Sequence, residues 1–124
     1  MDEKDPLTHA VIGAAIEVHR EMGPGLLESV YQKCMEAELK LKDLVFLAQA
    51  HLPLIYKGLM LGDDFIMDLY FPNRLVIELK AVEKVLPVHE AQLITYLRLS
   101  KTRVGLILNF NVPVQINGVV RRVL

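Results

Sequence analysis

The first third of the chain shows the spacing of amphipathic helices. Between residues 7 and 21 apolar side chains recur at intervals of three and four, and Pro6 stands where the first turn of a helix tolerates proline. Gly23 is predicted to end this helix, because glycine readily takes the positive φ of a helix C-cap. The same spacing predicts a second helix over residues 26–42.

From residue 45 onwards the pattern becomes mainly that of strands. Strands are predicted over residues 45–48, 52–57, 65–71, 75–80 and 103–109, with a helix over 87–100 and a closing hairpin through Asn117-Gly118. The order α-α-β-β-β-β-α-β-β predicts an α+β fold, in which a mixed central β-sheet is flanked by helices. With no linker, repeat or low-complexity run, we expect a single domain over residues 1–124.

Composition excludes several classes of protein. At 52% hydrophobic residues the chain can build a core, so disorder is excluded. The most apolar stretch, residues 44–56, is short and contains Gln49 and His51, so we expect no contact with a membrane interior. The acidic N-terminus lacks the apolar segment of a signal peptide, and Cys34 is the single cysteine. Both features favour a cytoplasmic protein.

Charge is unevenly distributed although the formal net charge is only −1. Residues 1–79 hold 7 basic and 13 acidic side chains, whereas residues 80–124 hold 7 basic and 2 acidic ones. The small net charge argues against a general nucleic-acid coat protein. The basic C-terminal part either faces an anionic ligand or pairs with the acidic part of the chain.

Alternation along the strands predicted at 65–71 and 75–80 separates an apolar face from a charged one. The apolar faces comprise Phe65, Met67, Leu69 and Phe71 on the first strand and Leu75, Ile77 and Leu79 on the second. The opposite faces carry Asp68, Glu78 and Lys80. A three-residue loop, 72–74, keeps the apolar faces together, whereas a two-residue loop would oppose Asp68 to Ile77. The longer loop sets Asp68 directly opposite Glu78.

Two carboxylates in opposite positions repel each other unless they share a cation. Oxygen ligands of this kind suit Mg²⁺ or Mn²⁺ better than zinc. Lys80, two residues beyond Glu78, reaches toward the same place and can hold a phosphate or a hydroxide. The alternative is a solvated sheet face, on which Lys80 only balances Asp68 and Glu78.

The helices add polar side chains to this picture. In the helix predicted at 87–100, His89, Gln92 and Tyr96 share one face that apolar residues border, which is typical of a helix lining a cleft. The alternative is a surface stripe, or a Gln92–Tyr96 hydrogen bond that serves stability alone. In the second helix Glu28 lies one turn before Tyr31, where it either joins a site or complements the helix dipole.

Taken together, these residues resemble a known family. The motif Gly25-x-x-Glu28-x-x-Tyr31 is similar to the signature of the GxxExxY proteins. The order Glu28, Asp68, Glu78-x-Lys80 and Gln92-x-x-x-Tyr96 resembles the RecB-type branch of the PD-(D/E)XK nuclease superfamily. The resemblance covers nearly the whole chain, although Met67 stands where the superfamily name has proline.

The resemblance implies a restriction-endonuclease-like fold and a nuclease that depends on Mg²⁺ or Mn²⁺. Asp68 and Glu78 would bind the metal, with the backbone carbonyl of Leu79 as a third ligand and Glu28 reaching it directly or through water. Lys80 would position the attacking water and stabilise charge on the phosphate. The substrate would be nucleic acid, with DNA favoured over RNA.

Gln92 and Tyr96 would, by the same resemblance, hold the site or the nucleic-acid backbone. Two other functions stay open. One is a binding or assembly module, possibly a homodimer, that keeps the nuclease fold without turnover. The other is an enzyme whose protein partner supplies the basic surface that this chain lacks.

Overall fold

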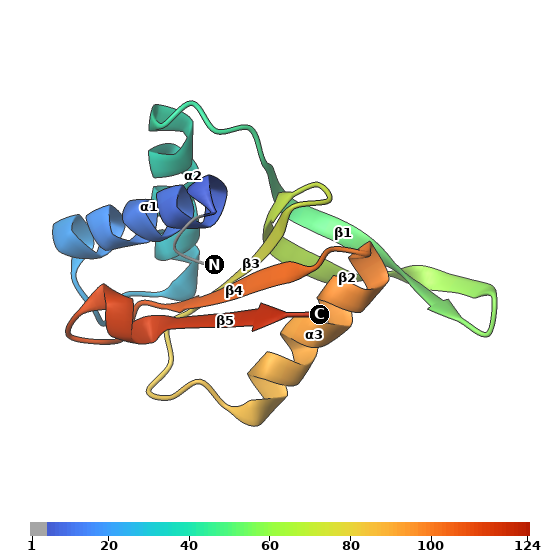
Figure 1. The fold of residues 1–124 in the computed structure, drawn as a ribbon. Helices are drawn as coiled ribbons and strands as arrows, with labels where there is room; N and C mark the ends of the chain where they lie inside the picture. Colours follow the sequence, from blue (N-terminus) through green and yellow to red (C-terminus); the bar gives the residue numbers. More distant parts are fainter. Residues whose placement is uncertain (1–4) are drawn as a thin grey trace.

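The computed structural model describes residues 5–124, which form one five-stranded sheet flanked by helices (Figure 1). The elements are α1 (Pro6–Met22), α2 (Glu28–Leu41), β1 (Leu47–Tyr56), β2 (Leu59–Phe71), β3 (Leu75–Lys80), α3 (Pro87–Ser100), β4 (Val104–Asn109), the short 3₁₀ helix η2 (Gln115–Gly118) and β5 (Val119–Val123). The predicted α+β fold class and order of elements are confirmed. In place of the two strands predicted at 45–48 and 52–57, the structure has one continuous strand, β1, which begins at Leu47 and ends at Tyr56.

The sheet is mixed, with spatial order β1-β2-β3-β4-β5. All neighbouring strands are antiparallel except β3 and β4, which run parallel. Parallel neighbours need a crossover connection, and α3 provides it. Helices α1 and α2 lie on one side of the sheet and α3 lies on the other (Figure 1). The end of β3 therefore lies between two helical layers.

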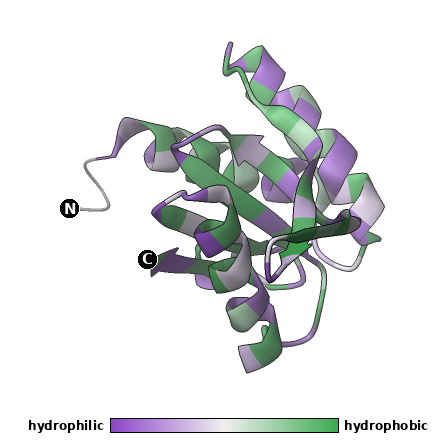
Figure 2. Ribbon diagram, turned by 90° about the vertical axis from the view of Figure 1, so that its right-hand side faces the viewer, coloured by the Kyte–Doolittle hydropathy of each residue, from purple (hydrophilic) through white to green (hydrophobic). Residues whose placement is uncertain are grey.

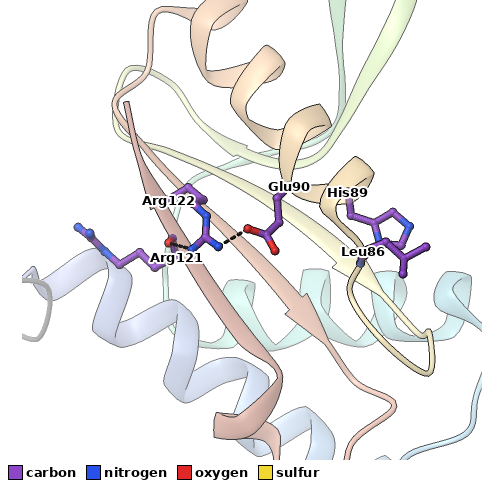
Figure 3. A network of polar contacts seen from close by, with 5 residues as sticks. All are labelled: Leu86, His89, Glu90, Arg121 and Arg122. Atoms are coloured by element: carbon purple, nitrogen blue, oxygen red, sulfur yellow. Dashed lines mark hydrogen bonds and ion pairs between the residues drawn. The ribbon is translucent and has the colours of Figure 1, made fainter.

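Two hydrophobic clusters hold these layers together. The larger joins α1 and α2 to the sheet, and within it the rings of Tyr31 and Phe110 stack with their centroids 4.4 Å apart. The smaller joins α3 to the sheet and includes Leu93 and Leu97. Arg122 of β5 also forms an ion pair with Glu90 of α3, which ties the C-terminal strand to the same helix (Figure 3).

Tyr31 also fixes the turn between the first two helices. Its hydroxyl donates to the carbonyl of Gly23 at 2.5 Å and accepts from the backbone N–H of Leu26 at 3.2 Å. Gly23 has a φ of 75° and caps α1, as predicted. Helix α2 begins directly after this turn, at Glu28. By fixing the turn, Tyr31 therefore also fixes the position of Glu28.

Strand β2 corrects one prediction. Leu69 and Phe71 pack in the cluster of α1 and α2, whereas Met67 packs in the cluster of α3, with Phe65 against it. The expected single apolar face is therefore wrong, because the strand turns from one layer to the other at Asp68. The neighbouring strand is irregular at the same level, where Gln49 adopts a φ of 51°.

Beyond the sheet, β1 and β2 continue as a two-stranded hairpin (Figure 1). The turn predicted at Lys57-Gly58 is confirmed, and both residues have positive φ, 50° and 80°. None of the helices in the described part of the chain, residues 5–124, has the length and apolar character needed to span a bilayer.

Candidate functional site

Where β2 leaves β3, the Glu78 carboxyl binds the backbone of Asp68, and the Asp68 carboxyl binds the backbone of Leu79. The ladder between the two strands pairs Phe71 with Leu75 and continues to Leu69 and Ile77, so the predicted register is confirmed. One step further, the backbone N–H of Asp68 donates to Glu78 Oε2 at 3.0 Å. The backbone N–H of Leu79 donates to Asp68 Oδ2 at 2.8 Å. Side-chain contacts thus replace ladder hydrogen bonds at this position.

The two carboxyl groups lie in a poorly solvated place. Glu78 is 5% exposed, so this part of the sheet is not the solvated face that the alternative interpretation required. Burial, together with the negative charge of Asp68, raises the pKa of Glu78 to about 8. Burial also raises the pKa of Asp68, although the N–H of Leu79 and the charge of Lys80 oppose this effect. Without a cation, the pair therefore resists carrying two negative charges.

Glu28 approaches the same place from the first turn of α2. Desolvation raises the pKa of its carboxyl, and the negative charge of Asp68 acts in the same direction. The charge of Lys80 and a hydrogen bond from the backbone N–H of Ala81 lower that pKa. These effects place the Glu28 carboxyl beside the end of β3, at the rim of the pair formed by Asp68 and Glu78.

Lys80 is the last residue of β3 and is half-buried. Its positive charge lowers the pKa of Glu28, Asp68 and Glu78, so the lysine and the three carboxyls interact electrostatically. The chain after it is held by Asn109, whose side chain accepts from the Val82 N–H at 3.1 Å and donates to the Val82 carbonyl at 2.9 Å. This buried amide fixes the direction in which the chain leaves β3.

Helix α3 contributes the predicted polar pair, in which Tyr96 is buried and Gln92 is exposed. Gln92 Nε2 donates to the hydroxyl of Tyr96 at 3.1 Å. Tyr96 is 4% exposed, and its ring lies 5.9 Å from that of Phe65. Burial raises the pKa of Tyr96, and the negative charge of Glu78 raises it further. The tyrosine therefore joins the α3 cluster to the carboxyl pair.

His89 lies in the first turn of α3 and caps that helix. Its Nδ1 accepts the backbone N–H of Leu86 at 3.0 Å, which leaves the ring proton of the neutral form on Nε2 (Figure 3). The charge of His89 also lowers the pKa of Glu28. The observed contact of the His89 side chain is thus with the start of its own helix, and its part in the site stays a prediction.

Two glutamines that sequence reasoning missed hold Asp68 from either side. Gln32 Nε2 donates to the Asp68 carbonyl at 2.9 Å, and Gln49 Nε2 lies 3.5 Å from Asp68 Oδ1. Gln32 had a signal in the sequence, because it follows Glu28 by four residues on the same helix face. Gln49 had none, since its side chain reaches Asp68 only through an irregular backbone in β1.

A cleft of about 400 Å³ opens between α2 and the hairpin strands beside Asp68. It is lined by Glu28, Ser29, Gln32, Lys33, Glu36, Gln49 and Asp68. The cleft leads solvent to the rim of the carboxyl cluster, whereas Glu78 lies behind it. A ligand in the cleft would meet Asp68 and Glu28 first.

The carboxyl groups of Glu28, Asp68 and Glu78 are of the kind that binds a divalent cation. In this structure, hydrogen bonds to the backbone hold two of them, Asp68 and Glu78. Within residues 5–124 no group of three His, Cys, Asp or Glu side chains is arranged as a metal site. The reason is visible in the contacts, since one oxygen each of Asp68 and Glu78 accepts a backbone N–H. Carboxyl groups that repel each other and lack solvent are nevertheless the kind that bound Mg²⁺ stabilises in ionised form.

One of three comparisons with known proteins finds a match for this chain. No match was found among curated proteins or among solved structures. The family model described as the PD-(D/E)XK nuclease superfamily matches residues 5–123, and this match includes all the side chains described above. Because it covers almost the whole sequence and the acidic residues and lysine stand in the order of that family's motif, the chain belongs to the PD-(D/E)XK nuclease superfamily.

Proposed function

We propose that this protein is a metal-dependent nuclease that hydrolyses phosphodiester bonds, with DNA as substrate and Mg²⁺ or Mn²⁺ as cofactor. The observation that carries the proposal is the contact between Asp68 and Glu78 beside Lys80, at the end of β3. Within the superfamily, the Gly25-x-x-Glu28-x-x-Tyr31 motif supports membership of the GxxExxY group. The single cysteine supports a cytoplasmic location.

In this proposal Asp68, Glu78, Glu28 and the Leu79 carbonyl hold the metal. The bound cation would lower the pKa of a water molecule and offset charge on the phosphoryl group. To hold the cation, the Asp68 and Glu78 carboxyls would turn toward it from their present backbone partners. The raised pKa of Glu78, about 8, means that a proton must leave this side chain when the metal binds.

Lys80 carries a positive charge that acts on all three carboxyls, and we assign it two tasks. It orients the attacking water, and it stabilises the negative charge that develops on the phosphate oxygens in the transition state. Gln92 and Tyr96 act behind the site. Their hydrogen bond fixes the Tyr96 hydroxyl, whose pKa the negative charge of Glu78 raises after burial, and we assign the pair the task of holding the site.

The test is cleavage of single-stranded, duplex and branched DNA and of RNA, in Mg²⁺, in Mn²⁺ and in EDTA. We expect Lys80→Ala and Glu78→Gln to lower the cleavage rate at least 100-fold while the far-UV circular dichroism stays unchanged. Lys84→Ala is the matched control, because Lys84 is exposed and lies four residues beyond Lys80. Equal loss in the control, or cleavage by wild type in EDTA, would contradict the proposal.

One observation favours the variant in which a protein partner completes the enzyme. The cleft beside Asp68 contains three acidic side chains, Glu28, Glu36 and Asp68, and a single basic one, Lys33. Such a surface repels a phosphate backbone, which nucleases usually hold with basic side chains. Metal binding without cleavage of any of the four substrates would favour the partner-dependent enzyme or the binding module over the autonomous nuclease.

A further inference from the structure

The distal part of the β1–β2 hairpin, residues 53–64, is here called the arm. Its most exposed large apolar side chains are each more than half exposed: Ile55, Tyr56, Leu59, Met60 and Leu61. Figure 2, in which the arm points toward the viewer, shows this hairpin coloured largely as hydrophobic. An isolated two-stranded hairpin is only marginally stable in water, so a surface of this kind calls for a cover.

The arm also has an unpaired strand edge. Among the described residues, β3 pairs with β2 only at residues 69–71, so along the arm β2 has no neighbour on its outer side. The turn at Lys57-Gly58 has two residues with positive φ, and Tyr56 pairs with Leu59 across it. In hairpins with a two-residue turn, the backbones of the two residues that flank the turn form hydrogen bonds with each other. The N–H and C=O groups of the following residue, Met60, therefore point away from β1, to the outer edge.

The sequence of this edge is complementary to itself. From Lys57 to Asp63 it reads Lys-Gly-Leu-Met-Leu-Gly-Asp, which is the same in both directions except that its ends carry opposite charges. Against β1 the strand has one extra residue, Leu61, between Met60 and Gly62. If two copies pair antiparallel about a two-fold axis at Met60, Leu59 lies next to this Leu61 of the second copy. At each end, Lys57 lies in the turn, and its long side chain extends toward Asp63 of the other copy.

We propose that the arm binds the arm of a second copy of this chain, with the outer edges of the two β2 strands antiparallel about an axis through Met60. This pairing covers the exposed leucines and satisfies the outward peptide groups of Met60. A pairing centred nearer the acidic end of the arm would instead bring Asp63 and Asp64 of both copies together and is disfavoured. The resulting dimer is closed, because the same surface of each copy is used.

The first test is the molecular mass in solution, by sedimentation equilibrium of the full chain. We expect wild type at twice 14.0 kDa at micromolar concentrations. Lys57→Asp and Asp63→Lys each place like charges opposite each other and should weaken the dimer at least 10-fold. The double variant exchanges the charges and should restore it. Lys84→Asp and Glu83→Lys, made at exposed positions outside the arm, are the matched controls.

The second test fixes the register by disulfide formation in a Cys34→Ala background. Residues that face each other in a hydrogen-bonded antiparallel pair have Cα atoms about 5.5 Å apart, a distance that a disulfide can span. Met60→Cys should therefore cross-link under mild oxidation much faster than Leu59→Cys, and Leu41→Cys, 77% exposed on α2, should not cross-link. A monomeric wild type, a double variant that fails to restore the dimer, or equal rates at residues 59 and 60 would overturn the proposal.

Discussion

Asp68 and Glu78 hold each other through the backbone: the Asp68 N–H binds the Glu78 carboxyl, and Asp68 accepts the N–H of the residue after Glu78. These two hydrogen bonds lie at the point where β2 passes from the hydrophobic cluster of α1 and α2 to that of α3. They keep two carboxyl groups next to each other in a place where neither is well solvated. The consequences can be measured without knowledge of the substrate.

Stability should fall as the pH rises through the neutral range in the absence of metal. The pKa of Glu78 is 4.5 in the unfolded chain and about 8 in the folded one, so between these values the folded state holds the additional proton. Unfolding then releases a proton, and the free energy of unfolding decreases by up to about 1.4 kcal/mol per pH unit. The raised pKa values of Asp68 and Glu28 act in the same direction.

Urea denaturation in EDTA at pH 6 and pH 8.5 measures this effect. We expect the wild type to lose stability on the order of a few kcal/mol between the two conditions. Glu78→Gln, which keeps an oxygen acceptor for the Asp68 N–H but cannot ionise, should be much less sensitive to pH. Wild-type stability that is constant or rises over this range would show that Glu78 is ionised in the folded protein.

Metal binding should reverse that loss, since the proposed cation stabilises the ionised carboxyls. A ligand at 100 times its dissociation constant adds about 2.7 kcal/mol to the free energy of unfolding. We therefore expect Mn²⁺ to raise the thermal midpoint more at pH 8.5 than at pH 6, and Asp68→Asn to abolish the rise. Glu21→Gln, at an exposed acidic position on α1 outside the arm, is the control that should respond like wild type.

Tyr31→Phe tests how the helix turn positions Glu28. The change removes the hydroxyl that donates to Gly23 and accepts from Leu26, while the ring stacked on Phe110 stays. We expect a loss of about 1–2 kcal/mol in the free energy of unfolding. If Glu28 takes part in metal binding, the affinity for Mn²⁺ measured by calorimetry should fall as well. An unchanged metal affinity would separate the tyrosine from the site.

Ile77→Glu should unfold the protein, because Ile77 is fully buried in the cluster of α1 and α2 and an unpaired charge there is costly. Ile66→Glu is the matched control, since Ile66 is 37% exposed on the neighbouring strand. Circular dichroism and thermal melting compare the two variants. A folded Ile77→Glu protein, or equal destabilisation of both, would contradict the observed packing of β3.

Local patterns in the sequence already determined much of this protein. The spacing of apolar residues predicted the three long helices, and Gly23 marked the end of the first. The three-residue loop and the register that follows it came from matching apolar faces across Phe71 and Leu75. These features depend on neighbours in the chain or on one hairpin, and for that reason the alternation of side chains is sufficient to predict them.

Only the tertiary structure decided the surroundings of the site. Alternation placed Met67 and Leu69 on one face, but they pack in different layers, because β2 turns at Asp68. The burial of Glu78 and the reach of Gln49 to Asp68 depend on helices and strands distant in the sequence. A local pattern indicates which side chains share a face of a strand. Which face is covered, and by which helix, depends on long-range packing.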